Sequence, residues 1–275
     1  MLIRCNSDTD CIVRMEEDWF LPYCYALGVF IPRAIFIEVV SMWNQLKENF
    51  IFVLCCAGII AALAVAAKIA ERYLPATRRT SKARQITIIS ICSAIAAVLH
   101  MLDFPLLFLA PAFYKLDFSE LPVMLCGFYL GPTSAVICEA LKIILKLLLK
   151  GTSTAFVGDF ANFAVGCSLV LPAVIIYHTR KTRISALWGL MAGTLFLTIF
   201  GSMFNAIYLL PKFSQLYGLP LDAIIGMGTK INGSITSLST FVLLAVAPLN
   251  LIKGVTISVL TLLLYKKVAR PLFGK

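Results

Sequence analysis

Polar side chains that interrupt long apolar runs are the residues best placed to do chemistry in this sequence. Asn250 and Lys253 stand three positions apart in the last apolar run, so in a helix both side chains project from one face. Asn205 lies in a second run, which has 28 residues and no charge. A charge at membrane depth is costly unless it faces a cavity or a partner, and no carboxylate lies near Lys253 in the sequence. Asn250 and Lys253 are therefore predicted to bind a ligand.

A second set of polar residues forms one helical stripe. Glu139, Lys142, Lys146 and Lys150 recur at spacings of three and four, which places them on the same side of a helix. The stripe favours an internal ion-pair ladder whose last lysines reach toward the membrane surface. His100 is interpreted as a core or pore residue that makes one hydrogen bond.

Motifs for catalysis and metal binding are absent from the sequence. There is no G-x-x-x-x-G-K-[ST], so the chain cannot by itself couple ATP to transport, and neither G-x-S-x-G nor H-E-x-x-H occurs. The nine cysteines are scattered without a C-x-x-C and are typical of small buried hydrophobic residues. The sequence therefore predicts that the protein is not an enzyme and that it holds neither a metal ion nor a cofactor.

The composition places these residues in a membrane protein. Hydrophobic residues make up 60% of the chain, charged residues make up 14%, and the mean hydropathy is +0.91. In an average soluble domain, hydrophobic residues make up about 45–50% of the chain and charged residues about 25%. The net charge of +10 is carried by short clusters between apolar runs, as the positive-inside rule predicts. A soluble enzyme is excluded, and nucleic acid is discounted as a partner.

The number of membrane crossings follows from the basic clusters at residues 78–84, 180–183 and 266–270. All three should face the cytoplasm, so an even number of crossings must separate each pair. Between the first two clusters the number is even only if the run 121–149 is divided, and Gly131-Pro132 provides the break. Six core helices are expected, at residues 86–109, 119–130, 133–150, 160–177, 184–211 and 247–265.

The predicted fold class is an all-α polytopic membrane protein, a six-helix bundle with an additional N-terminal transmembrane helix. Its parts are an N-terminal segment of unclear role (1–49), the extra helix (50–72), a basic cytoplasmic linker (73–85) and the six-helix domain with a cytoplasmic C-terminus (86–275). Pro248 is expected to break the chain, which leaves 224–246 as helical or re-entrant structure near the outer face. Whether that piece spans the membrane is left open.

The outer loops at residues 113–120, 150–159 and 212–230 mix aromatic residues with a few charges. Such a mixture suits a lid over a flat aromatic solute with polar edges, and it equally suits an interfacial aromatic belt. The sequence does not separate these two interpretations.

Four strings of the sequence are similar to those of a known family. LDFSELP (116–122), GFYLGP (127–132), GDFANF (158–163) and PLNLIKG (248–254) resemble the substrate-binding S components of energy-coupling factor (ECF) vitamin transporters, the riboflavin type in particular. The resemblance runs from about Thr87 to Lys267, with the strings in family order.

The resemblance implies a non-catalytic six-helix S-component bundle that captures riboflavin, its transported ligand, from outside. Its partners would be a module of one transmembrane scaffold and two ATPase subunits, which fits the missing ATP-binding motif. The residues that it implies for the flavin are Asn205, Asn250 and Lys253. Secondary candidates, within or beside the matching strings, are Lys115, Asp117, Asp159 and Asn162.

The resemblance also implies a docking surface. Members of the family use small residues four apart on their first helix to approach the scaffold, and the matching pair here is Ser93 and Ala97.

Three alternatives stay open. One is an S component for another vitamin or a flavin nucleotide, because Lys253 can meet a uracil-like edge or a phosphate. Another is a polytopic membrane enzyme for lipid or isoprenoid substrates, although its usual D-x-x-D or histidine motif is missing. The last is a scaffold subunit without a ligand, which would leave Asn250 and Lys253 unexplained.

Overall fold

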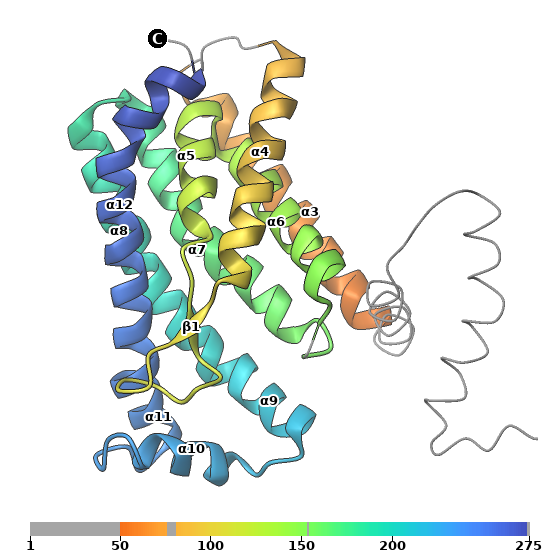
Figure 1. The fold of residues 1–275 in the computed structure, drawn as a ribbon, viewed down its shortest axis with the longest axis vertical. Coiled ribbons are helices and arrows are strands. Elements are labelled where there is room, and N and C mark those ends of the chain that lie inside the picture. Colours follow the sequence, from red (N-terminus) through yellow and green to blue (C-terminus); the bar gives the residue numbers. More distant parts are fainter. Residues whose placement is uncertain (1–49, 76–80, 153, 274–275) are drawn as a thin grey trace, which may run out of the picture.

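The protein is a bundle of long helices (Figure 1). The computed structural model describes residues 50–75, 81–152 and 154–273. Within these ranges, its elements are α3 (Phe50–Tyr73), α4 (Lys82–Met101), β1 (Phe104–Pro105), β2 (Lys115–Leu116), α5 (Glu120–Leu130), α6 (Pro132–Lys150), α7 (Val157–Arg180), α8 (Arg183–Phe204), η1 (Asn205–Leu209), α9 (Leu210–Tyr217), α10 (Leu221–Thr229), α11 (Leu238–Phe241), η2 (Val242–Val246) and α12 (Ala247–Phe273).

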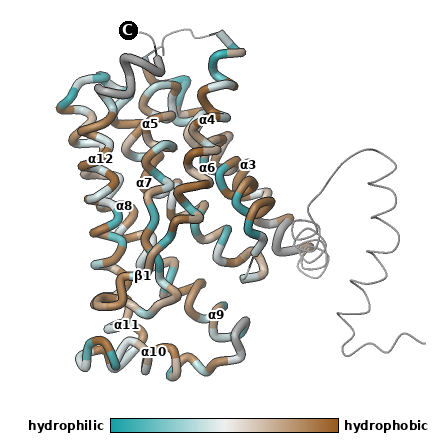
Figure 2. The backbone as a smooth tube through the Cα atoms, in the orientation of Figure 1, coloured by the Kyte–Doolittle hydropathy of each residue, from teal (hydrophilic) through white to brown (hydrophobic). Residues whose placement is uncertain are grey.

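Most of the bundle is apolar along its helices. Four of the described helical segments are long and apolar enough to cross a membrane, namely Lys82–Met101, Val157–Arg180, Arg183–Gln215 and Leu238–Tyr265. Figure 2 shows hydrophobic residues along the helices and hydrophilic residues at the ends of the bundle and beside α10. This arrangement confirms the predicted all-α membrane fold.

The break predicted at Gly131-Pro132 is confirmed. Gly131 has a φ of 114°, which favours glycine, and it ends α5 where Pro132 begins α6. The side chain of Glu71, near the end of α3, packs against this turn and accepts a hydrogen bond of 2.6 Å from the Thr133 hydroxyl. A carboxylate at the start of α6 also suits the positive end of the helix dipole.

The break predicted at Pro248 is wrong, because α11, η2 and α12 form one continuous helix. The π-helical turn η2 ends with the Ala247 N–H bonded to the Val242 carbonyl, and Pro248, which has no N–H, follows directly. The turn η1 is built in the same way, with the Leu210 N–H on the Asn205 carbonyl and Pro211 next. In both places the wider turn lets the helix continue past a proline. Residues 224–246 therefore divide between α10, a loop and the start of the last helix.

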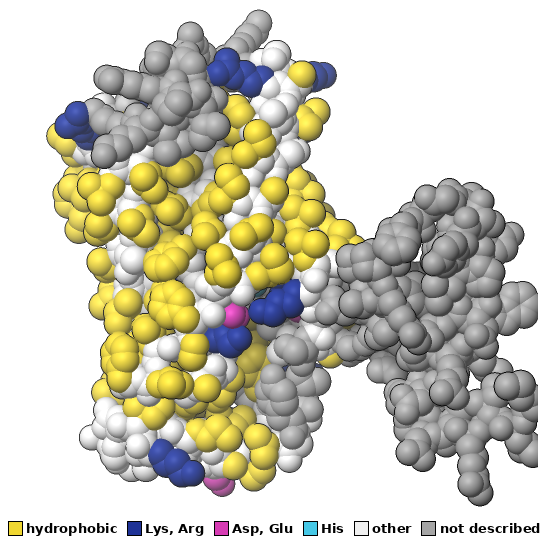
Figure 3. All heavy atoms as spheres, in the orientation of Figure 1, with side chains coloured by type: hydrophobic (Ala, Val, Ile, Leu, Met, Phe, Trp, Pro, Cys, Tyr) yellow, Lys and Arg dark blue, Asp and Glu magenta, His cyan; other side chains and the backbone are white. Residues whose placement is uncertain are grey.

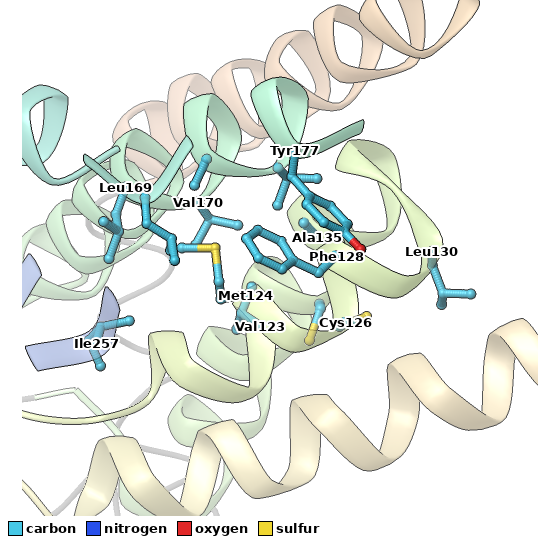
Figure 4. Packing of buried hydrophobic residues seen from close by; sticks show 14 of the residues in the cluster. Val123, Met124, Cys126, Phe128, Leu130, Ala135, Leu169, Val170, Tyr177 and Ile257 are labelled. Carbon is cyan, nitrogen blue, oxygen red and sulfur yellow. The ribbon is translucent and has the colours of Figure 1, made fainter. Parts of the chain in front are cut away.

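The main core lies between α4, α5, α6, α7, α8 and α12. Figure 4 shows Phe128 of α5 beside Tyr177 of α7, and their rings stack with centroids 4.3 Å apart. Helices α7 and α8 approach closely because Gly189 and Gly193 lie against backbone carbonyls of α7, where a Cβ would overlap. The core thus fixes α5, α7 and α12, which also carry the polar residues described below.

Helix α3 packs along α6 and lies outside the six-helix pattern (Figure 1). Ala67 is buried in a small cluster with Val136 and Phe163, while most other side chains of α3 face outward. The helix matches the predicted range 50–72, and its crossing of the membrane stays a prediction. The segment 1–49 and residues 78–80 of the basic cluster at 78–84 lie outside the described residues.

The predicted docking pair is buried. Ser93 and Ala97 are each 1% exposed, and the Ser93 hydroxyl donates to the Ile89 carbonyl at 2.7 Å and lies 3.3 Å from the Cys138 carbonyl of α6. The pair therefore packs α4 against α6 within this chain, and its assignment as a docking surface stays a prediction.

Candidate functional site

A cavity of about 370 Å³ opens in the half of the bundle that is nearer to α9 and α10. Figure 3 shows lysine and acidic side chains gathered around a hollow on an otherwise apolar face. The cavity lies between the α4–α5 connection, α6, α7, η1 and α12. Its lining includes every predicted ligand-binding residue, namely Lys115, Asp117, Asp159, Asn162, Asn205, Asn250 and Lys253.

Lys253, at the buried end of the cavity, is held by two carboxylates. Its Nζ lies 3.0 Å from Glu120 Oε1 and 3.3 Å from Asp117 Oδ2, and the lysine side chain is 10% exposed. The expectation of a lysine without a carboxylate is wrong, since both partners come from a segment more than 130 residues earlier. We call this end of the cavity, formed by His100, Asp117 and Lys253, the floor.

Asp117 is the acidic residue of the floor, and both of its carboxylate oxygens have partners. One of its oxygens, Oδ1, accepts the Ser119 backbone N–H at 2.8 Å, and the other lies 3.3 Å from His100 Nδ1. Burial favours the neutral carboxyl, but the Lys253 ammonium and His100 outweigh burial and hold the pKa of Asp117 well below its usual range. Asp117 is therefore an anion that orients Lys253.

A second layer of charge lies directly beneath the floor. Lys142 of α6 is fully buried and contacts Glu139, Glu120 Oε1 at 3.5 Å and the Ser119 hydroxyl at 3.1 Å. Gly166 of α7 makes room for Glu139, because a Cβ there would overlap the carboxylate. The ion-pair ladder predicted for the α6 stripe is thus confirmed for Glu139 and Lys142.

The two asparagines of the cavity differ in whether their side-chain amides already have hydrogen-bond partners. Asn205 donates to the Gly201 carbonyl at 2.7 Å and accepts the Tyr114 hydroxyl at 2.7 Å. Asn250 is 7% exposed, and its amide nitrogen has no hydrogen-bond partner among the described residues. That nitrogen lies against Gly201, where a Cβ would be 2.7 Å away. A buried donor without a partner is costly, so Asn250 offers the stronger hydrogen bond to a ligand.

Aromatic rings form part of the cavity wall. Phe113 and Tyr114 from the α4–α5 connection and Phe213 of α9 all line it, and the rings of Phe113 and Phe213 meet edge to face with centroids 6.3 Å apart. Burial raises the pKa of the Tyr114 hydroxyl, which therefore stays a neutral donor to Asn205. Aromatic walls combined with convergent polar groups are typical of a small-molecule site.

A third group of charges surrounds the opening, and we call it the rim: Asp103, Lys115, Lys146, Lys150 and Asp159. Its ion pairs join Lys115 to Asp103 at 3.1 Å, Lys150 to Asp103 at 3.8 Å and Lys146 to Asp159 at 2.6 Å. The side chains of Lys115, Lys150 and Lys146 are 43%, 48% and 14% exposed, respectively.

Sequence reasoning missed Lys146, Lys150 and Asp103 as cavity residues. The signal for the lysines was their place at the end of the α6 stripe, next to the loop that carries Asp159. No comparable signal marked Asp103. Among the described residues, no group of three or more His, Cys, Asp or Glu side chains is arranged to hold a metal ion.

Comparison with known proteins finds one family over most of the chain. The family described as "ECF transporter, substrate-specific component" matches residues 84–265. The riboflavin transporter RibU of Staphylococcus aureus (strain TCH60) is 34% identical over 186 residues, which cover 68% of this chain and 90% of that protein. The riboflavin transporter FmnP of Bacillus subtilis (strain 168) is 30% identical over 187 residues, 68% of this chain and 92% of that one.

A solved structure agrees with these relatives. It is described as the S component of a bacterial ECF transporter, it is 34% identical in sequence, and it superposes with a TM-score of 0.54. The match covers 69% of this chain and 97% of the other. Residues 50–75, with α3, lie before the region that the family matches.

Proposed function

The chain belongs to the family of ECF transporter substrate-specific components, and from that premise we propose that its cavity binds riboflavin for import. The observation that carries the proposal is the free amide donor of Asn250 beside Lys253, in a chain that is 34% identical to a riboflavin transporter. Such a protein is a transport subunit and not an enzyme.

The chemistry of the cavity suits a flat ring with one polar edge. Riboflavin is a three-ring system whose last ring carries two carbonyls and an N–H, with a chain of hydroxyl groups on the central ring. The Asn250 amide and Lys253 supply donors for the carbonyls, while the aromatic walls suit the ring faces. The volume lies near the lower end of the range of about 300–1,000 Å³ for small-molecule sites.

Direct binding tests the proposal. The protein purified in detergent should carry or take up riboflavin, seen as the visible absorption of the flavin and as quenching of its fluorescence on titration. Thiamine and biotin, which lack this ring edge, serve as control vitamins and should not compete. Folded protein that binds another vitamin more tightly than riboflavin would reject the assignment.

Import requires a partner that hydrolyses ATP, and family membership implies association with an ECF energising module. We propose that this module has one transmembrane scaffold and two ATPase subunits, and that it meets α4. On that helix Ser90 and Ala94 are exposed small residues one turn apart, and each is followed by an exposed isoleucine, Ile91 and Ile95. Small residues permit close helix approach.

Two tryptophan variants test this contact. Ala94→Trp should leave riboflavin binding by the isolated protein intact and lower uptake into cells that contain the module. Ala97→Trp, three residues away but buried against α6, is the contrasting control and should lower folded yield itself. Normal uptake by Ala94→Trp would show that the module docks elsewhere.

We also propose that the C-terminus faces the cytoplasm. The described basic residues at that end of the bundle are exposed: Lys82, Arg84, Arg180, Lys181 and Arg183. In a cysteine-free background, Thr182→Cys should be shielded from an impermeant thiol reagent in intact cells, while Asp222→Cys at the opposite end should react. The reverse pattern would overturn this orientation.

A further inference from the structure

The floor and the layer beneath it contain more acids than lysines. The five charged groups, which we call the floor cluster, are Asp117, Glu120, Glu139, Lys142 and Lys253, and each is buried. Two ammonium groups thus face three carboxylates within one connected set of ion pairs. The cluster has no surplus positive charge, even though a lysine lines the cavity beside Asp117.

Glu120 is the member that joins the two halves of the cluster. Its Oε1 lies 3.0 Å from Lys253 Nζ and 3.5 Å from Lys142 Nζ, so one oxygen serves both lysines. Its other oxygen has no hydrogen-bond partner among the described residues. Glu120 itself does not line the cavity. Any effect of Glu120 on a ligand is therefore indirect, through the position of Lys253 and through the net charge of the floor cluster.

We propose that Glu120 is a positioning residue that sets the charge of the floor, so that the floor accepts an uncharged hydrogen-bonding edge of the ligand and excludes an anionic group. This inference rests on the proposed function and deepens it. A lysine with no acidic partners attracts phosphate or carboxylate, whereas Lys253 already faces two carboxylates at 3.0 and 3.3 Å. A third anion would enter a poorly hydrated site with no unmatched cation.

The imide of riboflavin provides a probe of this charge. Its ring N–H is neutral near pH 7 and loses its proton in alkaline solution, which changes the visible absorption of the flavin. If the floor disfavours an anion, the bound imide must hold its proton to higher pH than the free vitamin does. His100 is the remaining titratable group of the floor, and its Nδ1 lies 3.3 Å from Asp117 Oδ2.

The decisive variant is Glu120→Gln, which keeps the shape of the side chain and removes one negative charge. It leaves two lysines with two carboxylates, so the charges of the cluster become equal in number and riboflavin should still bind. The pKa of the bound imide should then fall by about one unit from the wild-type value, a roughly tenfold gain in relative affinity for the anion. Asp222→Asn is the matched control, because it makes the same charge change at an exposed position of α10 outside the cavity lining, and it should leave that pKa in place.

A second variant keeps the test decisive if Glu120→Gln does not fold. Glu139→Gln removes a deeper carboxylate of the same cluster and should lower the bound imide pKa by a smaller amount. An unchanged imide pKa in the folded variant would overturn the proposal, as would loss of riboflavin binding by folded Glu120→Gln. Failure of the wild-type protein to bind riboflavin would instead reject the proposed function, so the two failures are distinguishable.

Discussion

The floor cluster and the rim are built from the same residue types in opposite surroundings. In the floor cluster, Lys142 and its partners Glu120 and Glu139 are no more than 1% exposed. At the rim, Lys115 and Lys150 are 43% and 48% exposed. Breaking a buried ion pair costs about 3–5 kcal/mol, because it leaves a charge without water or partner, whereas an exposed pair contributes about 0–1 kcal/mol. The distance within an ion pair therefore does not reveal its importance.

The largest difference between the two regions should appear in stability. Lys142→Met leaves Glu120 and Glu139 facing each other in a dry interior, and should lower the free energy of unfolding by about 3–5 kcal/mol. Thermal unfolding in detergent measures the loss. The double variant Lys142→Met/Glu139→Gln removes one of the stranded charges and should recover a large part of it. A Lys142→Met variant as stable as the wild type would show that the buried ion pairs matter no more for stability than the exposed pairs of the rim.

A smaller effect should appear in ligand binding at the boundary of the floor. Lys253→Met removes one charge-assisted hydrogen bond to riboflavin, so binding should weaken by about 1.5–3 kcal/mol in calorimetric titration. The variant also strands Asp117 and Glu120, so Lys253→Met/Glu120→Gln is the better-folded form for comparison. Unchanged affinity in both variants would place the ligand away from Lys253.

The smallest effect should come from the rim. Lys150→Ala breaks an exposed pair of 3.8 Å, so both stability and riboflavin affinity should change by less than about 1 kcal/mol. Any remaining effect should shrink as salt is added, because exposed charges are screened. Lys146→Ala provides the comparison within the rim, since this lysine is 14% exposed and also bonds the Gly151 carbonyl. A loss at Lys150 as large as that at Lys253 would contradict the comparison.

The parts of the fold that sequence predicted well are those set by neighbouring residues. The split at Gly131-Pro132 follows from local backbone preferences, and the structure places α5 and α6 on either side of it. Pro248 gives the same local signal, but the helix continues past it. The wider π-helical turn before Pro248 accommodates a residue that has no N–H to donate. A single proline does not show which of the two outcomes applies.

The site shows the same division between local and distant information. The shared face of Asn250 and Lys253 follows from their spacing, and both line the cavity. The partners of Lys253 do not follow from spacing, since Glu120 and Asp117 meet it only when α5 packs against α12.

The docking surface is subject to a related limit of local information. Ser90/Ala94 and Ser93/Ala97 are both pairs of small residues at the same interval on α4. The first pair is exposed beside exposed apolar side chains, whereas the second pair is buried. Small residues at helical spacing show that a close approach is possible. They do not show which neighbour makes the approach.

The π-helical turn before Pro248 has a consequence for how this chain tolerates changes in length. A π turn amounts to one extra residue within a helix, so deleting one residue from 242–246 would restore an ordinary α-helix. The segment before the deletion would then rotate by about 100° relative to the segment after it. Phe241, fully buried against its neighbours, would swing away from them, while Asn250 and Lys253 kept their places. A one-residue deletion here would thus preserve the helix and misalign its two halves.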